Sequence, residues 1–221
     1  SDAVFTILAP TPVITVTSPN GGNIYYVGGN YNISWTYQYV SGSFVAIDYS
    51  TDNGSTWNPI VASTSISAGS YLWNNIPNTP SAQCLVRVSE FGNPGVNDAS
   101  NAVFSIVYPY VVVTAPNGAE SWKGCTSQTI TWDAYQYGTM TVKVEYSTDN
   151  GTTWTILTNS TSSNFYTWNP LPNTVTFTQC LVRVTKTTDA LVTDVSNANF
   201  TINKINYIVV TSPNGGESWQ V

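Results

Sequence analysis

The chain has 221 residues, only 8% of them charged, and its formal net charge is −6. With six Lys and Arg, it lacks the basic surface that nucleic acids and anionic membranes require, and no apolar run is long enough to cross a membrane. The absence of histidine removes the commonest general base, the usual zinc ligand and the Ser-His-Asp triad.

The chain repeats itself with a period close to 97 residues. Pro19, Pro116 and Pro213 each follow a short β-like run and precede Asn-Gly, and their spacings are 116 − 19 = 97 and 213 − 116 = 97. Residues 1–7 match 100–106 and 196–202, each a predicted last strand. A fixed period of this length indicates tandem modules. We therefore predict the last strand and linker of a preceding repeat at 1–12, one domain at 13–107, a second at 108–206, and the first strand of a following repeat at 207–221.

Apolar and polar side chains alternate along the predicted strands of each repeat. Ile33 and Trp35 share one face, as Ile130 and Trp132 do in the second copy. The most regular strand, residues 84–88, returns as 180–184. This period of two over about seven strands predicts an all-β fold of tandem immunoglobulin-like or fibronectin III-like sandwiches. The short junctions contain proline and no glycine, which predicts an extended rod.

A hairpin stands at the same place in both repeats. Its centre is Asp52-Asn53-Gly54 in the first copy and Asp149-Asn150-Gly151 in the second. Asn-Gly tolerates the positive φ angles of a type I′ turn. Each aspartate is either a metal ligand or an acceptor for turn amides, and no second carboxylate stands beside it as a Ca²⁺ site needs. We therefore interpret Asp52, Gly54, Asp149 and Gly151 as structural turn residues.

The charged and aromatic side chains around the hairpins allow two interpretations. Trp57 and Trp154 either cover the end of the core or form a platform on which a sugar stacks, and the repeat favours the core. Asp48 with Arg87, and likewise Glu145 with Arg183, lie on outward faces of strands predicted to be neighbours. We expect cross-strand ion pairs rather than sites.

Asp98 and Asp194 recur just before the last strand of each repeat, close to the domain junction. Calcium at such a place stiffens some adhesins, so a Ca²⁺ site at Asp98 and Asp194 is one hypothesis. Its alternative is that the chain binds no metal or cofactor, because each repeat offers one carboxylate there and Ca²⁺ requires several oxygen ligands.

Four motifs together resemble a known group of repeats: residues 212–219 (SPNGGESW), 130–132 (ITW), 145–154 (EYSTDNGTTW) and 180–184 (CLVRV). They are similar to the immunoglobulin/fibronectin-like repeats of large secreted or cell-surface Bacteroidetes proteins, often exported by the type IX route. The resemblance implies a stalk or spacer without catalytic residues, and an extracellular location. Its partners would be neighbouring repeats of the same chain, other protein subunits or surface polysaccharide. The hairpin also resembles the Asp-box of sialidase-like propellers, but the 97-residue spacing does not fit propeller blades.

The cysteines also leave two possibilities. Cys84 and Cys180 begin the same strand in the two repeats, whereas Cys125 occurs only in the second. In an immunoglobulin-like sandwich the strands after Cys125 and Cys180 start at the same end, which permits a Cys125–Cys180 disulfide. The alternative is three free thiols.

These observations lead to two functional hypotheses. The first is a non-catalytic structural or adhesive repeat region of a large extracellular protein. The alternative is a carbohydrate-binding accessory region of an exported enzyme, because 13% of residues are aromatic and tyrosines gather after the Trp35 and Trp132 strands, namely Tyr37, Tyr39, Tyr135 and Tyr137. We do not expect an enzyme, because no carboxylate pair or nucleophile–base set recurs.

Overall fold

The computed structural model describes residues 8–206, 208, 210–212 and 214–220. The predicted strand at residues 1–7 lies outside the described residues. The described residues after Asn203 form no strand. The chain divides into two compact units: the first reaches Pro109 and also takes in residues 136–139, and the second holds Tyr110–Tyr135 and the chain from Met140 onward.

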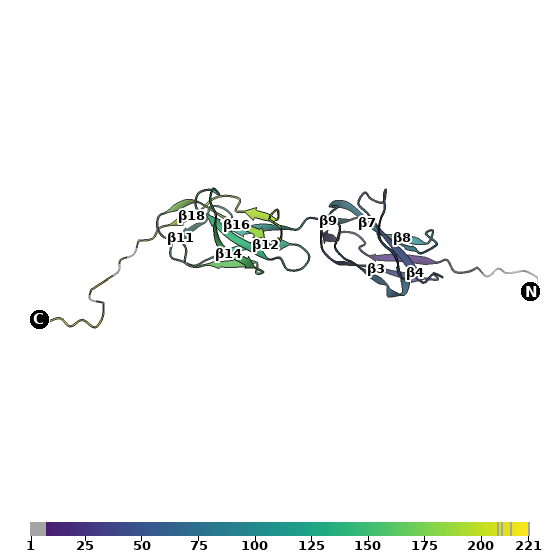
Figure 1. Ribbon diagram of the computed structural model, residues 1–221, viewed down its shortest axis with the longest axis horizontal. Coiled ribbons are helices and arrows are strands. Elements are labelled where there is room, and N and C mark those ends of the chain that lie inside the picture. The colour runs from purple at the N-terminus through teal and green to yellow at the C-terminus, as the bar shows by residue number, and fades with distance from the viewer. Residues whose placement is uncertain (1–7, 207, 209, 213, 221) are drawn as a thin grey trace, which may run out of the picture. The chain divides into compact units, whose positions relative to one another are not determined.

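Strands make up the first unit (Figure 1). They are β1 (Val13–Ser18), β2 (Ile24–Tyr26), β3 (Tyr31–Gln38), β4 (Phe44–Ser50), β5 (Asn58–Ser65), β6 (Ser70–Trp73), β7 (Ser81–Glu90), β8 (Asn97–Ala99) and β9 (Phe104–Val107), with a 3-10 turn at Ile66–Ala68. One sheet has the order β1-β3-β6, and the other β2-β9-β7-β4-β5 with β8 paired to β7. Two mainly antiparallel sheets in this order are an immunoglobulin/fibronectin III-like sandwich.

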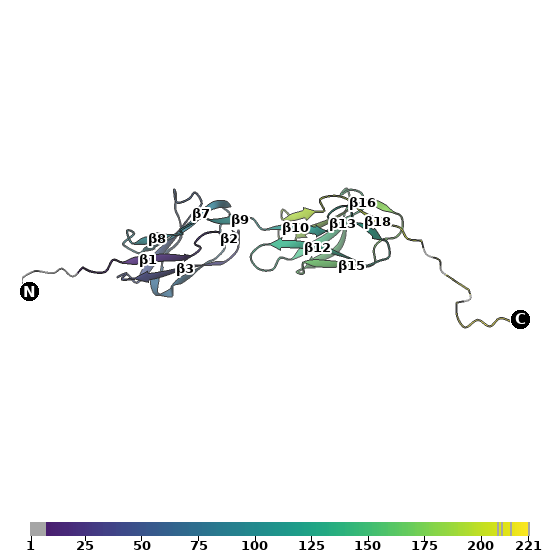
Figure 2. The same ribbon diagram turned by 180° about the vertical axis from the view of Figure 1, so that it is seen from behind.

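The second unit repeats the arrangement (Figure 2). Its strands are β10 (Tyr110–Ala115), β11 (Ser121–Lys123), β12 (Gln128–Tyr135), β13 (Val142–Ser147), β14 (Thr155–Thr161), β15 (Phe165–Trp168), β16 (Phe177–Lys186), β17 (Thr193–Val195) and β18 (Phe200–Asn203). The sheets have the orders β10-β12-β15 and β11-β18-β16-β13-β14. The predicted all-β fold of immunoglobulin-like sandwiches is confirmed.

Each sandwich encloses a core of its own, built from the inward residues of the alternating strands. Ile33 and Trp35 are buried in the first core, and the indole Nε1 of Trp35 donates to the Ile66 carbonyl at 3.0 Å. Ile130 and Trp132 hold the same places in the second core. Cys84 and Cys180 are also buried. The alternation that predicted these inward faces is therefore confirmed at every one of these positions.

A short parallel pair ties the beginning of each unit to its end. β2 runs parallel to β9, with Tyr25 opposite Ile106. The amide of Ser105 donates to the Asn23 carbonyl at 2.9 Å. β11 and β18 form the same pair in the second unit, where the Thr201 amide donates to the Glu120 carbonyl at 2.8 Å.

Candidate functional site

The hairpin between β4 and β5 is held by one aspartate. Asn53 and Gly54 have φ angles of 56° and 87°, which glycine adopts freely and asparagine tolerates. The Asp52 carboxylate accepts the Thr56 amide at 2.8 Å, the Thr56 hydroxyl at 2.6 Å and the Ser50 hydroxyl at 2.7 Å. The hairpin between β13 and β14 repeats these bonds at the same lengths around Asp149. Both aspartates thus serve the turn.

The same donors set the protonation of these carboxyls. Hydrogen bonds from the Thr56 side chain, the Thr56 amide and Ser50 lower the pKa of Asp52 to about 2. The corresponding bonds from Thr153 and Ser147 lower the pKa of Asp149 to about 2. Because the donors favour the charged form, neither group is suited to act as a general acid at neutral pH.

The low pKa values predict a pH dependence of stability. A carboxyl whose pKa falls on folding stabilises the native state above its unfolded value of 3.8, and this contribution is lost as pH falls toward about 2. The double variant Asp52→Asn and Asp149→Asn should melt lower than the wild type at pH 7, and its melting temperature should fall less between pH 4 and pH 2. Thermal melts across this range test it, with Asp133→Asn as the control. Equal pH profiles for wild type and double variant would contradict the assignment.

A ladder of charged and aromatic side chains covers the outer face of each larger sheet. Arg87 donates to Asp48 across β7 and β4 at 2.9 Å, and its guanidinium lies 4.3 Å from the centre of the Trp57 ring. In the second unit Arg183 pairs with Glu145 at 2.8 Å and lies 4.2 Å from the Trp154 ring. The predicted cross-strand ion pairs are therefore present.

The position of Trp57 and Trp154 corrects the sequence interpretation. Both are half-buried and belong to neither core. Each packs on the outside, between its arginine and the glycine of its own hairpin, with Gly54 close to Trp57 and Gly151 close to Trp154. They do not cover the end of the core, and the arginine covers one face of each ring.

The structure gives Asp98 and Asp194 a role within the sandwich. The Asp98 carboxylate on β8 accepts the Val16 amide of β1 at 2.7 Å. Asp194 accepts the Val113 amide at 2.8 Å. Val16 and Val113 each stand where the pairing of the first strand shifts register, so the carboxylate pairs with an amide beside a bulge. Among the described residues, no three His, Cys, Asp or Glu side chains gather as metal ligands do.

A buried serine links three parts of each unit, and the sequence analysis did not single it out. The Ser100 hydroxyl donates to the Pro19 carbonyl at 2.7 Å and accepts the Val86 amide at 3.0 Å. Ser196 makes the equivalent bonds to Pro116 and Val182. The available signal was the recurrence of Ser-Asn-Ala at 100–102 and 196–198.

The proposed disulfide is not formed. All three cysteines are free, with Cys125 exposed and Cys180 buried. Cys125 lies in the turn before β12 with a φ of 58°, and its side chain faces solvent. Cys180 points into the core, where burial raises the pKa of its thiol to about 11. The two side chains thus point into different environments, which corrects the Cys125–Cys180 prediction.

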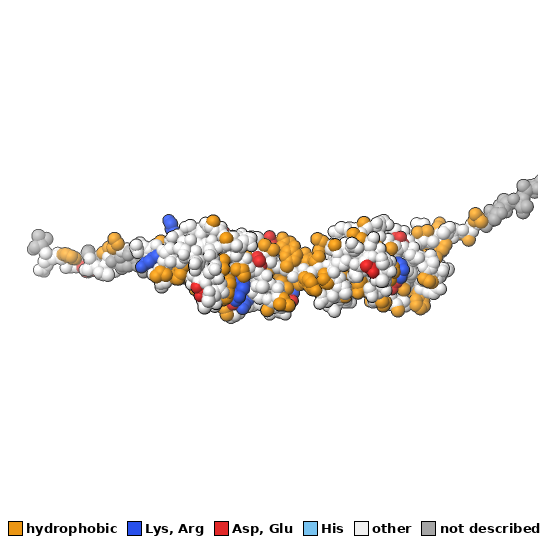
Figure 3. All heavy atoms as spheres, turned by 90° about the horizontal axis from the view of Figure 1, so that it is seen from above, with side chains coloured by type: hydrophobic (Ala, Val, Ile, Leu, Met, Phe, Trp, Pro, Cys, Tyr) orange, Lys and Arg blue, Asp and Glu red, His pale blue; other side chains and the backbone are white. Residues whose placement is uncertain are grey.

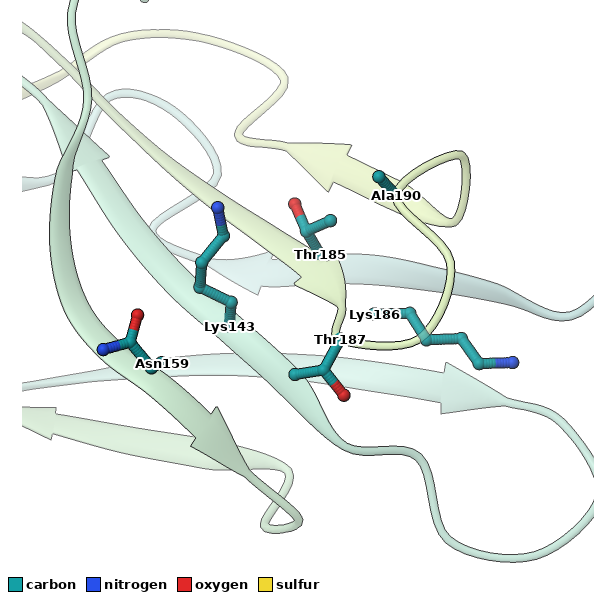
Figure 4. Close-up of a pocket in the computed structure, with 6 residues that line it drawn as sticks. All are labelled: Lys143, Asn159, Thr185, Lys186, Thr187 and Ala190. Atoms are coloured by element: carbon teal, nitrogen blue, oxygen red, sulfur yellow. The ribbon is translucent and has the colours of Figure 1, made fainter.

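A shallow hollow lies on the outer face of the second unit, lined by Lys143, Asn159, Thr185, Lys186, Thr187 and Ala190. In Figure 4 the Lys186 side chain extends away from Lys143. The Lys143 ammonium binds Glu145 at 2.9 Å, and the Thr187 hydroxyl shares a hydrogen bond with Thr141. Lys143, Thr185 and Thr187 are thus engaged with Glu145, Thr193 and Thr141 beside the hollow, so the hollow lacks the convergent free groups of a ligand site.

The four tyrosines singled out from the sequence are exposed: Tyr37 and Tyr135 lie near the ends of β3 and β12, and Tyr39 and Tyr137 follow these strands. Tyr135 lies at the end of β12, where it stacks on Tyr110 of β10 with ring centres 4.5 Å apart.

Charged side chains are sparse on the face shown in Figure 3. No helix in the described part of the chain is long and apolar enough to cross a membrane.

Comparisons with known proteins give structural neighbours only. No protein-family model matches the chain, and no curated protein matches it. The fibronectin(III)-like modules of Clostridium thermocellum CbhA align with 87% of this chain and 94% of their own, at 18% identity and a TM-score of 0.28. Chimeric titin Z1Z2 aligns with 90% of this chain and 100% of its own length, at 13% identity and a TM-score of 0.41. Sidekick-1 immunoglobulin domains 1–5 align with 87% of this chain and 40% of their own length, at 8% identity and a TM-score of 0.41.

Proposed function

We propose that this chain is a non-catalytic structural and adhesive repeat region, a stalk or spacer, of a large secreted or cell-surface protein. One observation carries the proposal: the recurring carboxylates are engaged in holding their own module. Asp52 closes a hairpin, Asp98 accepts an amide of β1, and Asp48 pairs with Arg87. The equivalent carboxylates of the second unit, Asp149, Asp194 and Glu145, do the same. Acidic groups used in this way are not available for acid–base catalysis.

The sequence motifs support an origin among the exported repeats of Bacteroidetes proteins, with the hairpin as an Asp-box-like element of each repeat. The proline-containing junction at residues 106–110 supports a stiff connection, and hence a rod. In such a rod the principal partners are neighbouring repeats of the same chain. Surface polysaccharide or other protein subunits would be the adhesive partners.

A stalk has to carry tension, and the parallel pair in each unit is placed to resist it. A pull on the chain ends acts on β2 and β9 in opposite directions along strands that run parallel. The hydrogen bonds between them, including the bond from Ser105 to Asn23, are then loaded together rather than one after another.

Single-molecule pulling tests the proposal. We expect two unfolding events of similar size, each releasing about 97 residues or roughly 350 Å of chain at about 3.6 Å per residue. Ser105→Pro removes an amide donor of the β2–β9 pair and should lower the force of one event, while Thr201→Pro should lower the other. A single event for the whole chain, or forces that neither substitution changes, would contradict a tandem whose units each resist tension through this strand pair.

The carbohydrate-binding accessory role remains a second candidate. The observation in its favour is a group of exposed aromatic rings on the smaller sheet of the second unit, formed by Tyr110, Tyr135 and Phe165.

A further inference from the structure

The outer face of the β10-β12-β15 sheet carries aromatic rings at both ends of a strip that is formed by Thr131 and Asp133 of β12 and by Val112 and Thr114 of β10. Tyr110 pairs with Tyr135, and Phe165 stands opposite Thr131. Residues 131, 133 and 135 of β12 share this face, because side chains alternate along a strand. Phe165 and Tyr135 therefore lie four residues apart along the sheet, about 13 Å at about 3.3 Å per residue. Figure 2 shows the three strands of this sheet.

The rings of this face all keep solvent-exposed surface, and the two tyrosines each cover one face of the other. Tyr110 is 47% exposed, Tyr135 37% and Phe165 55%. The two tyrosines stack with an interplanar angle of 17°, so each fixes the orientation of the other. The sheet thus presents a prearranged aromatic pair at one end and a single ring at the other.

A carboxylate without a partner stands between the two aromatic positions. Asp133 is exposed, and among the described residues its side chain forms no hydrogen bond or ion pair. An apolar protein surface placed over this strip would leave the charge unpaired, which is costly. A sugar instead offers pairs of hydroxyl donors to the carboxylate and an apolar C–H face to the rings.

The first unit lacks this arrangement on the same sheet. Its outward residues at the corresponding places are Val13 for Tyr110, Gln38 for Tyr135, Thr36 for Asp133 and Ser70 for Phe165. The matching strand pairings of the two units identify these positions, so the aromatic and acidic residues are an addition to the common module. Packing of the sandwich does not require them, because the first unit is built without them.

We infer that the face formed by Tyr110, Asp133, Tyr135 and Phe165 binds an uncharged polysaccharide chain, which lies along the strip between the two aromatic positions. Neutral sugars fit because Asp133 and the net charge of −6 both repel anionic chains. The inference rests on the carbohydrate-binding alternative and not on the stalk role, so the pulling experiment can succeed or fail independently of it.

Affinity electrophoresis of the full chain tests the inference. Native gels contain hydroxyethylcellulose, galactomannan or polygalacturonate, and mobility is compared with that in a gel without polysaccharide. We expect at least one neutral polysaccharide to retard the chain and polygalacturonate to leave it unaffected. Tyr110→Ala and Phe165→Ala should each weaken the binding by about fivefold to tenfold, as the loss of one aromatic contact does. Asp133→Asn should weaken it as well.

Leu72→Ala is the matched control, because Leu72 is exposed on the equivalent sheet of the first unit, β1-β3-β6. This variant should bind like the wild type. Thermal melts check that each variant is folded, and amide shift mapping of the wild type with cellohexaose or mannohexaose should place the shifts on β10, β12 and β15. The inference is overturned if no neutral polysaccharide retards the chain, if polygalacturonate alone does, or if the variants bind as tightly as the wild type.

Discussion

Trp132→Ala should destabilise the second unit by about 3–5 kcal/mol and leave the first unit folded. Trp132 is fully enclosed in the second core, on β12 between the two sheets. A domain of this size is stable by about 5–15 kcal/mol, so this loss removes a large share of it. Because each unit has its own core, calorimetry should resolve one transition at the wild-type temperature and one well below it.

Trp154→Ala is the informative control for this prediction. Trp154 is half-buried outside the core and its ring lies under Arg183, so its removal should cost about 1 kcal/mol. Trp35→Ala should shift the other transition, since Trp35 belongs to the first core. Similar losses from Trp132→Ala and Trp154→Ala would show that the second ring is also a core residue.

The contrast between these tryptophans explains which predictions from sequence succeed. Ile130 and Trp132 stand two residues apart in a regular strand, and the period of two assigns both to one face whatever the partner strands are. Trp154 follows a turn, where the period is interrupted. Its orientation depends on the positive φ angles of Asn150 and Gly151 and on the arginine of another strand, neither of which the local pattern contains.

Interactions between distant segments were harder to predict. Asp194 was placed correctly near the end of a repeat, but its partner is the Val113 amide, 81 residues away in sequence. Recurrence identified the residue, and only the sandwich topology identified the acceptor role. The Cys125–Cys180 pairing failed for a related reason: strand direction placed both residues at one end, but the turn conformation of Cys125 directs its side chain to solvent.

The candidate sugar-binding face was only half visible in the sequence. Tyr135 was singled out for its neighbours in the loop, whereas the ring it stacks on is Tyr110, and the other ring of this face is Phe165, four residues along the sheet. Those residues come from three strands whose register is set by pairing. A single sequence gives the outward side of each strand, but not which outward residues meet.

Ser196→Ala should be the most damaging small substitution in the second unit, costing about 2–4 kcal/mol. The Ser196 hydroxyl donates to the Pro116 carbonyl at 2.7 Å and accepts the Val182 amide at 3.0 Å, all in a buried setting. Alanine leaves that carbonyl and that amide without this partner, and each buried group left unpaired costs about 1–3 kcal/mol. Urea denaturation measures the loss, and hydrogen exchange at the Val182 amide should accelerate.

Ser100→Ala should produce an equal loss in the first unit, whereas the exposed Ser160→Ala should change stability by less than about 0.5 kcal/mol. A loss from Ser196→Ala no larger than that from Ser160→Ala would mean that water or neighbouring groups replace the serine, and that the link between β16 and the turn at Pro116 does not depend on it.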